Sequence, residues 1–474
     1  MNLENSNNEF EDQSFRDSIA TIDKEGKRTW IYPLKPSGKY YNLRTYFTLV
    51  YIIVFFSLPF IKYHDEPLFL LDVVNKKFIL FGAIFWPQDF FIFMIGMITF
   101  IVFIALFTVV FGRLFCGWAC PQTVFMEMIF RKIEYWIDGD ATYQKQLKKS
   151  GWTKEKIVKR VSKAIIFYAL AFLISSTFLS YIVGFEKVKL ILLNPGTNIG
   201  SLIGIFIFSS VFFFIYWWFR EQACLIVCPY GRMQGVLLDK NSIVVAYDYV
   251  RGEPRHKIKK SEERTTGDCV DCGLCVKVCP TGIDIRHGTQ LECVSCTACI
   301  DVCDNMMTKV GLQPGLIRYD SENGVKNKIN LRFTNRMKAY SIVLILLIGL
   351  EVFMLASRSD FDVTILRAKG MLFQEQENNQ ISNLYTIKLV NKTRKALPVD
   401  IQLENIKGYS VRFIGKDLVL KPESISEGEF FLYLNKDEIK DRKTNVVFTI
   451  TSNGKLIKRV KTNFLGPFKI QSKS

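Results

Sequence analysis

Five long stretches of apolar residues interrupt a chain that is otherwise rich in charge. They run over Arg44–Ile61, Gln88–Phe111, Ser162–Gly184, Ile199–Phe219 and Lys338–Ala356. A helix needs about 17–25 mostly apolar residues to cross the hydrocarbon core of a bilayer. The pattern therefore predicts a multi-domain membrane protein built on an α-helical bundle of about five transmembrane spans.

Beyond Ser357 the pattern changes from long apolar runs to short alternating ones. Apolar and polar residues alternate in "FDVTIL", "LYTIKLV", "VDIQLE", "VRFIG", "EFFLYL" and "NVVFTIT", with turn residues between them. Alternation with a period of two is typical of half-buried strands, and about seven such strands indicate a sandwich of two sheets. We expect residues 358–474 to form an all-β, immunoglobulin-like sandwich.

Basic residues decide the orientation of the predicted spans. The 474-residue chain has a formal net charge of +17. Lysine and arginine are dense between spans two and three and between spans four and five, but sparse in 62–87 and 185–196. Basic loops stay in the cytoplasm. We therefore expect a multi-pass membrane protein with a cytoplasmic N-terminus and a C-terminal domain on the opposite side of the membrane. The charge then reflects topology and a lipid bilayer partner, with no nucleic acid.

Eight of the twelve cysteines lie in one short segment between the fourth and fifth spans. The first four follow the pattern C-x2-C-x2-C-x3-C-P, at Cys269, Cys272, Cys275 and Cys279, and the second four repeat the cysteine spacing at Cys293, Cys296, Cys299 and Cys303. In two-cluster ferredoxins the fourth cysteine of each run ligates the other cluster. We therefore assign Cys269, Cys272, Cys275 and Cys303 to one [4Fe-4S] cluster and Cys293, Cys296, Cys299 and Cys279 to a second.

Zinc and disulfides are the alternatives for these eight thiols. A zinc site does not need the third cysteine of each series, and a disulfide framework has no reason for the duplicated spacing. Asp304 stands where a second proline is usual, which affects the predicted loop shape and hardly the ligation. Thiolates on iron also require a reducing compartment, which agrees with the orientation predicted from charge.

The other four cysteines form two matched C-x3-C-P motifs, each at the inner end of a predicted span. Cys116 and Cys120 precede Pro121, and Cys224 and Cys228 precede Pro229, with a constant offset of 108 residues. The repetition indicates two related hairpins. If the helix continues through each motif, its two cysteines share one face, and the prolines kink or restart the helix just beyond them.

Two converging pairs would make a four-thiol site at the membrane boundary. Thiolates are soft ligands that suit Cu(I), iron–sulfur centres or zinc. The alternatives are buried structural thiols and a redox disulfide pair. Met126, Met128 and Met233 lie close in sequence, although packing is their ordinary role. We expect structural roles for His64, His256 and His287, since none has a second histidine at ligand spacing.

These patterns divide the chain into five parts. They are a polar cytoplasmic tail (1–40), a four-span region with both C-x3-C-P motifs (41–240), an inserted cytoplasmic two-cluster ferredoxin-like α+β domain (241–337), a fifth transmembrane helix (338–357) and the sandwich (358–474). We expect the tail to lack structure as far as about Trp30.

Together, "RLFCGWACPQTVFMEMIFRKIE", "CLIVCPYGRMQGVLLDKNSIVVAYDYVRGEPR" and the two ferredoxin motifs closely resemble the FixG/RdxA/CcoG family of cytochrome c oxidase accessory proteins. The paired membrane motifs are shared with NapH-like and NosR-like proteins, and "YDYVRGEPR" with the sandwich narrows the resemblance. It implies an oxidoreductase that reduces Cu(II) and supplies Cu(I) for assembly of cbb3-type cytochrome c oxidase. Copper at Cys116, Cys120, Cys224 and Cys228 would be the catalytic metal. A cytoplasmic electron donor and an oxidase assembly factor or copper transporter would be the partners.

Two other functions fit the same residues. One is a quinone-linked electron-transfer subunit of NapH-like type, without copper chemistry. The other is a copper chaperone whose clusters sense redox state.

Overall fold

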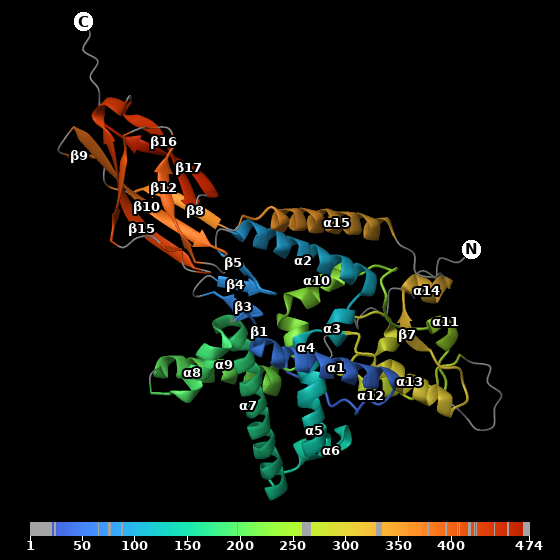
Figure 1. Ribbon diagram of the computed structural model, residues 1–474. Coiled ribbons are helices and arrows are strands. Elements are labelled where there is room, and N and C mark those ends of the chain that lie inside the picture. The colour runs from blue at the N-terminus through green and yellow to red at the C-terminus, as the bar shows by residue number, and fades with distance from the viewer. Residues whose placement is uncertain are drawn as a thin grey trace. The chain divides into compact units, whose positions relative to one another are not determined.

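The computed structural model describes residues 21–467, with gaps at 23–24, 65, 74–76, 87–88, 197, 258–266, 329–333, 360, 369, 371, 377–378, 394–395, 405, 407, 416–418, 421, 423, 440 and 453–454. Residues 1–20, half of the predicted tail, lie outside the described residues. The chain forms two compact units. Unit 1 comprises 1–76 and 94–350, and unit 2 comprises 77–93 and 351–474. Each unit has its own core of buried residues. Figure 1 labels the helices and strands of the chain.

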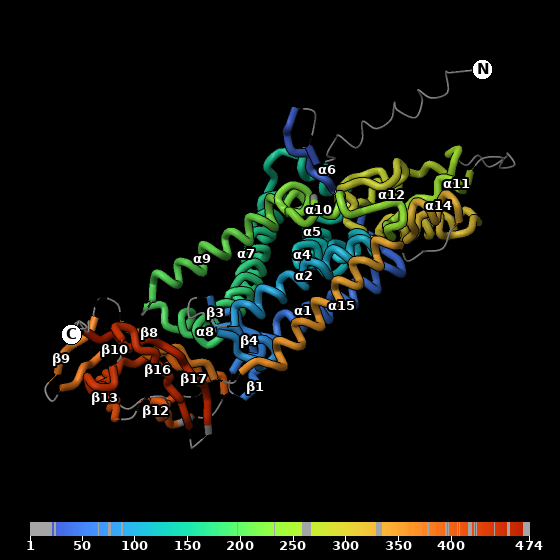
Figure 2. The backbone as a smooth tube through the Cα atoms, turned by 90° about the horizontal axis from the view of Figure 1, so that it is seen from above, coloured from blue at the N-terminus to red at the C-terminus, as the bar shows by residue number. Residues whose placement is uncertain are grey.

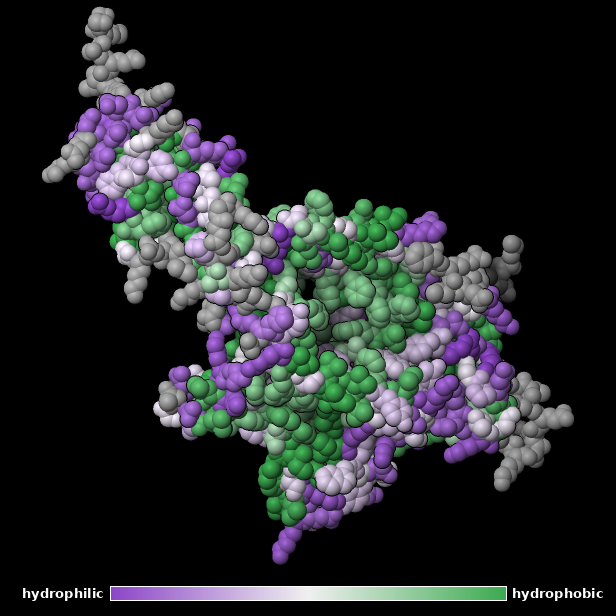
Figure 3. All heavy atoms as spheres, in the orientation of Figure 1, coloured by the Kyte–Doolittle hydropathy of each residue, from purple (hydrophilic) through white to green (hydrophobic). Residues whose placement is uncertain are grey.

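Five helices in the described part of the chain are long and apolar enough to cross a membrane, as predicted. They span Lys39–Phe60, Phe90–Phe111, Lys154–Val183, Ile199–Phe219 and Asn335–Ala356. The third begins well before the predicted Ser162, because Thr153 caps it by accepting a hydrogen bond from the Lys156 N–H, and a basic turn follows. Figure 3 shows hydrophobic surface over α2 (Phe90–Phe111) and α7 (Lys154–Val183).

The helices of unit 1 include several short ones at the cysteine motifs. In order they are α1 Lys39–Ser57, α3 Leu114–Trp118, α4 Pro121–Phe125, π-helix Met126–Phe130, α5 Arg131–Asp138, α6 Ala141–Lys149, α8 Phe185–Leu193, α9 Ile199–Phe214, π-helices Ile215–Phe219 and Ala223–Val227, α10 Pro229–Leu237, α11 Tyr249–Gly252, α12 Leu274–Val278, α13 Ala298–Lys309, α14 Glu322–Asn327 and α15 Asn335–Ala356, which continues into unit 2. Its strands are β1 Lys62–Tyr63, β2 Glu66–Pro67, β3 Phe69–Asp72, β6 Val244–Tyr247 and β7 Ile317–Asp320.

α7 and α9 lie side by side in unit 1 (Figure 2). Their contact includes a hydrogen bond of 2.6 Å between the hydroxyls of Ser175 and Ser209. At the end of α9 that lies near the cysteine motifs, aromatic rings fill the space. Phe130 stacks on Tyr216, with ring centres 4.3 Å apart, and meets Phe167 edge-on. This cluster fixes the segment after the first C-x3-C-P motif against α7 and α9.

The segment with eight cysteines folds around a small sheet and two helices. β6 pairs with β7 in antiparallel register, with Val245 opposite Tyr319. α12 packs against α13. Buried side chains between them, among them Ile300, Met307 and Ile317, form a core that includes several of the cysteines.

Unit 2 contains the predicted β-structure. One antiparallel sheet has the order β13-β15-β10-β8, with β9 also paired to β10, and a second has the order β12-β16-β17. The strands are β4 Lys77–Leu80, β5 Ala83–Phe85, β8 Phe361–Arg367, β9 Gln374–Gln376, β10 Gln380–Asn391, β11 Leu397–Pro398, β12 Asp400–Leu403, β13 Ser410–Ile414, β14 Val419–Leu420, β15 Ile425–Asn435, β16 Lys443–Ser452 and β17 Lys455–Leu465. Phe430 of the first sheet packs edge-on against Phe448 of the second, so the two sheets share one core.

A buried ion triad ties the start of α2 to the sandwich within unit 2. The Asp89 carboxylate pairs with Lys392 at 2.6 Å and with Arg358 at 2.7 Å. Asp89 and Lys392 are each only 6% exposed at the side chain. Burial alone would raise the pKa of Asp89, but the hydrogen bonds and charges of Lys392 and Arg358 outweigh burial, and the pKa is lowered.

The prediction that the tail lacks structure as far as about Trp30 is wrong for Arg28. Arg28 pairs with Glu221 at 3.2 Å and lies 3.9 Å over the ring of Trp30. Beyond Trp30, the Leu34 N–H donates a hydrogen bond to the carbonyl of Lys277, which lies within the first cluster motif. Polar composition alone did not reveal these contacts with distant segments.

Candidate metal and electron-transfer centre

The helix does not continue through either C-x3-C-P motif. α3 ends at Trp118, Cys120 is extended (φ −65°, ψ 125°), and α4 begins at Pro121. The second motif behaves alike, with Cys228 extended (ψ 112°) and α10 beginning at Pro229. The residue before a proline is pushed toward extended backbone, and proline suits the first position of a helix. The break therefore lies before the proline, and a shared helical face for each cysteine pair is wrong.

The four thiols nevertheless gather at one place in unit 1. Cys116 interacts electrostatically with Cys120 and Cys228, and Cys224 with Cys120, Cys116 and Cys228. The Cys116 thiol donates a hydrogen bond of 3.3 Å to Oε1 of Gln234 on α10. The fold thus brings both motifs together, and we call Cys116, Cys120, Cys224 and Cys228 the thiol quartet.

Burial keeps protons on at least two thiols of the quartet when no metal is bound. It raises the pKa of Cys116 to about 11 and that of Cys224 to about 12, and neighbouring cysteines add to both shifts. Metals bind the thiolate. A metal at the quartet must therefore displace these protons, so its affinity rises with pH.

The eight ferredoxin cysteines line two neighbouring hollows. The first is bordered by Cys269, Cys272, Cys275 and Cys303, together with Tyr247 and Met307. The second is bordered by Cys279, Cys293, Cys296 and Cys299, with Cys275 at its edge. Each hollow therefore meets three cysteines of one run and the fourth of the other, which is the crossed arrangement of two-cluster ferredoxins. We call the first hollow cluster site one and the second cluster site two.

The fourth cysteine of the first run leaves its helix for the same reason as Cys120 and Cys228. Cys279 precedes Pro280, is extended (ψ 122°) and ends α12. Cys303 has Asp304 after it in place of proline, and α13 continues through it to Lys309. The Asp304 carboxylate accepts a hydrogen bond of 2.7 Å from the Gly315 N–H. Asp304 therefore anchors a following loop, a role that the sequence comparison of motifs did not indicate.

Ligand spacing distinguishes a cluster from a single ion. Among the described residues, no three or more Cys, His, Asp or Glu side chains converge as ligands around one metal ion. The cysteines of cluster sites one and two surround hollows, which suits a multi-atom iron–sulfur cluster better than one ion. The thiol quartet likewise lacks the geometry of a single-ion site as it stands.

Cluster site two lies directly against the first C-x3-C-P motif. A Cβ atom on Gly117 would lie 2.5 Å from the carbonyl oxygen of Val294 and 2.6 Å from that of Ser295. The indole N–H of Trp118 donates to the hydroxyl of Tyr319, which donates in turn to the carbonyl of Ser295. Only a residue without a side chain permits this approach at position 117.

Two arginines bind the same surfaces together. Arg44 of α1 is 4% exposed and donates to the carbonyl oxygens of Gly117 at 2.8 Å and Cys296 at 3.5 Å. Arg113 donates to the carbonyl oxygens of Leu291 and Gly231, which precede cluster site two and follow Cys228. The guanidinium groups therefore join both C-x3-C-P motifs to the cluster loop. The predicted first span began at Arg44, but no sequence signal linked it to cysteines so far along the chain.

A small cavity lies between Cys224 of the quartet and cluster site two. Its walls include Thr123, Met126, Cys224, Thr281 and Val294. Met126 is buried, whereas Met233 is 43% exposed. Among the methionines considered from sequence, Met126 thus faces this cavity. The order cluster site one, cluster site two, quartet follows from shared walls and direct contacts.

α1 is attached to the cluster segment through Asp301. Its carboxylate accepts hydrogen bonds from the backbone N–H groups of Tyr40 at 3.0 Å and Tyr41 at 2.7 Å, in the first turn of α1. Asp301 lies in α13 between Cys299 and Cys303. A carboxylate at a helix N-terminus satisfies free N–H groups and favours the helix dipole.

Three protein families match parts of the chain. A family described as "4Fe-4S binding domain" matches residues 93–139, and one described as "4Fe-4S dicluster domain" matches residues 219–322. Each match includes one C-x3-C-P motif. A family described as "IG-like fold at C-terminal of FixG" matches residues 351–467, which confirms the predicted immunoglobulin-like domain.

Related proteins extend over most of the chain. Protein RdxA of Cereibacter sphaeroides is 33% identical over 380 residues, covering 77% of this chain and 80% of the relative. Protein RdxB of the same organism is 31% identical and covers 80% and 82%. Nitrogen fixation protein FixG of Rhizobium meliloti is 29% identical over 467 residues and covers 86% and 87%.

Proposed function

The chain belongs to the FixG/RdxA family of iron–sulfur electron-transfer proteins, and from this premise we propose that it is a membrane-bound cupric reductase. Its product would be Cu(I) for assembly of cbb3-type cytochrome c oxidase. The observation that carries the proposal is the contact between cluster site two and the thiol quartet through Gly117 and Arg44. The contact would give electrons a short path from a cluster at cluster site two to the thiol quartet.

The chain's own residues divide the work as follows. Iron–sulfur clusters held by the eight ferredoxin cysteines exchange single electrons when bound. Arg44 and Arg113 hold the cluster loop against the quartet, and buried apolar side chains such as Ile283 and Ile285 line cluster site two. The quartet would bind copper as substrate. One electron per ion converts Cu(II) to Cu(I), and the thiols that bind it release their protons.

Soft ligands give the reaction its direction. Cu(II) prefers nitrogen and oxygen ligands, whereas Cu(I) prefers thiolate and thioether sulfur. A site made of Cys116, Cys120, Cys224 and Cys228, with Met126 nearby, would stabilise the reduced ion. Because the four thiols do not now surround one point, we expect them to draw together when copper binds.

We also propose the orientation and partners that the charge pattern favours. Basic segments would keep both cluster sites in the cytoplasm of a bacterial inner membrane, where a cytoplasmic donor supplies electrons. The immunoglobulin-like domain would then lie in the periplasm. Its partner would be an oxidase assembly factor or a copper transporter.

The test uses the purified full chain with reduced clusters. Cu(II) is added with a Cu(I) chelator, and bleaching of the iron–sulfur absorption is followed against chelator colour. We expect one Cu(I) for each electron lost, and a large loss of rate in Cys116→Ala with Cys224→Ala. Met233→Leu, an exposed site beside the second motif, is the control and should keep the rate.

Other results would replace the proposal. An unchanged rate in the double variant, with full iron content, would rule out the quartet as the copper site. Cluster oxidation that responds to quinone and ignores copper would favour the NapH-like alternative. Copper binding without turnover would favour a chaperone.

A further inference from the structure

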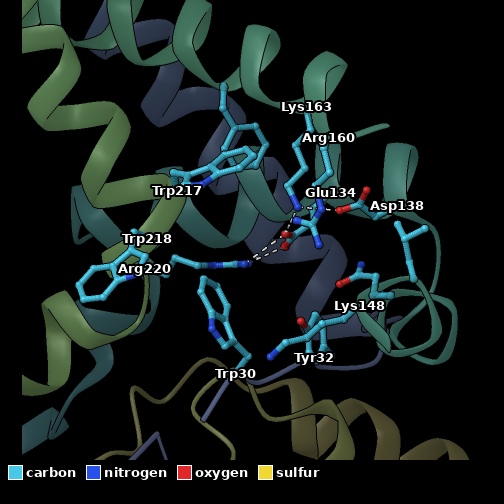
Figure 4. Close-up of a pocket in the computed structure, with 13 residues that line it drawn as sticks. Trp30, Tyr32, Glu134, Asp138, Lys148, Arg160, Lys163, Trp217, Trp218 and Arg220 are labelled. Carbon is cyan, nitrogen blue, oxygen red and sulfur yellow. Dashed lines mark hydrogen bonds and ion pairs between the residues drawn. The ribbon is translucent and has the colours of Figure 1, made fainter. Parts of the chain in front are cut away.

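A cavity of about 250 Å³ lies where the basic end of α7 meets the last turn before Arg220 (Figure 4). Neither the cluster sites nor the quartet uses it. Its walls carry Trp30, Tyr32, Phe167, Trp217 and Trp218, and four basic side chains reach it from α6, α7 and the residue after the π-helix Ile215–Phe219. We call it the aromatic pocket.

Two of the basic side chains are neutralised by acids in the pocket wall. Lys163 lies 2.6 Å from Glu134 and 2.6 Å from Asp138, and Arg220 lies 2.5 Å from Glu134. Glu134 also lies 4.0 Å from Arg131, and Arg220 lies 3.8 Å from Glu221, so both pocket cations are balanced by buried carboxylates. Figure 4 shows Arg220 reaching toward Glu134 from the side of Trp218, whereas Lys163 comes from α7.

The other two basic side chains are in excess. No carboxylate among the described residues forms an ion pair with Lys148 or Arg160. Lys148 lies 5.8 Å from the ring centre of Trp30 and 5.9 Å from that of Tyr32, so aromatic faces are its nearest favourable contacts. The pocket therefore holds two positive charges beyond what its own acids balance, and it suits an anion.

The position of the pocket decides which anion reaches it. α7 is basic from Lys154 to Lys163 and apolar beyond, and the apolar run of the neighbouring helix stops at Phe219, before Arg220 and Glu221. Both candidate spans therefore change from apolar to polar at this level. Tryptophan, tyrosine and basic residues gather at such a boundary because ring and charge face headgroups there. Basic pockets between transmembrane helices bind lipid headgroups.

We propose that the aromatic pocket binds the phosphate group of an anionic phospholipid from the leaflet on the cysteine-motif side. Lys148 and Arg160 hold the phosphate, and the rings of Trp30, Trp217 and Trp218 cover the glycerol and the start of the acyl chains. A neutral quinone would leave both surplus charges uncompensated. A free phosphate would leave the aromatic walls without a partner. Because Cys224 follows Arg220 by four residues, the bound lipid steadies the segment that enters the thiol quartet.

The experiment titrates the purified full chain with short-chain phosphatidylglycerol and, separately, short-chain phosphatidylcholine, reading tryptophan fluorescence. We expect at least tenfold tighter binding of the anionic lipid. Lys148→Gln with Arg160→Gln should weaken it about 30-fold, the change that corresponds to about 1 kcal/mol for each basic side chain. Lys145→Gln with Lys149→Gln removes the same charge from exposed positions of α6 and should change affinity less than twofold.

Further measurements distinguish lipid binding in the pocket from nonspecific attraction by positive charge and from misfolding of the variants. Arg160→Lys keeps the charge and should keep lipid selectivity, and unchanged iron–sulfur absorption reports an intact fold. Equal affinity for both lipids, or equal loss in the control pair, would overturn the proposal. So would displacement of the bound lipid by inorganic phosphate, or by a short-chain quinone, at the same concentration.

Discussion

Replacing Gly117 by alanine places one methyl group between the first C-x3-C-P motif and cluster site two. The new Cβ would lie 2.5 Å from the carbonyl oxygen of Val294, whereas ordinary contact begins at 3.4 Å, so the loop must retreat by about 0.9 Å. Both nearest obstacles are backbone atoms, which cannot rotate away. The hydrogen bond from Arg44 to the carbonyl of Gly117 must adjust as well.

Two opposing effects set the magnitude. Overpacking a well-filled contact costs about 1–3 kcal/mol, and alanine in the helix α3 regains up to about 1 kcal/mol over glycine. We therefore expect a net loss of up to about 2 kcal/mol in the close contact, which lowers the equilibrium constant for forming it by a factor of up to about 30. The rate of Cu(II) reduction should fall by a similar factor, and the melting temperature by a few degrees.

The assay combines thermal unfolding, iron content and the chelator-coupled reduction rate. Gly204→Ala is the matched control, because it adds the same methyl to a helical glycine of α9 with no atom within 4 Å. It should keep the rate, and it should keep or slightly raise the melting temperature because alanine favours the helix over glycine. The reasoning is refuted if Gly117→Ala and Gly204→Ala have equal rates and melting temperatures.

Three further predictions follow from buried charges. Glu134→Gln should destabilise the chain by about 3–5 kcal/mol, because Arg220 and Lys163 lose a buried partner. An unchanged melting temperature would contradict this. Because the folded-state pKa of Asp89 is lowered, its stabilising contribution is complete at neutral pH and is lost as pH falls below about 4. In Asp89→Asn the β-sheet signal in circular dichroism should melt earlier at pH 7 and show less dependence on pH between 5 and 3. Asp301→Asn removes the negative charge at the N-terminus of α1 and should destabilise the chain by about 0.3–1 kcal/mol. The melting curve measures it, and equal curves would show that the cap does not contribute.

Local patterns predicted most of the fold. Each of the five apolar runs is a helix in the structure. These runs could be predicted because length and apolar composition are read directly from the sequence. Alternation predicted the sandwich strands, and β8, β10 and β15 follow it closely because one face of each is buried. The ends of α1 and α7 were less predictable, since capping and packing extend helices past their apolar residues.

The site was predictable only in part. Cysteine spacing predicted the candidate cluster ligands, because the loop that wraps a cluster is built from residues close together in the sequence. The break at Cys120 was also within reach, since the rule for residues before proline applies there. The approach of Gly117 to Val294 and the bridge from Arg44 to Cys296 were not, because 252 residues separate that last pair. Such contacts depend on how distant segments pack.

The cap of α1 by Asp301 has a consequence for biosynthesis. The helix leaves the ribosome first, but the carboxylate that completes its first turn is synthesised 260 residues later. Until that stretch has been translated and its loops have closed, the opening turn of the earliest apolar segment keeps free amide groups. Because Asp301 lies between Cys299 and Cys303, folding of the cluster segment and completion of the first turn of α1 depend on the same carboxylate.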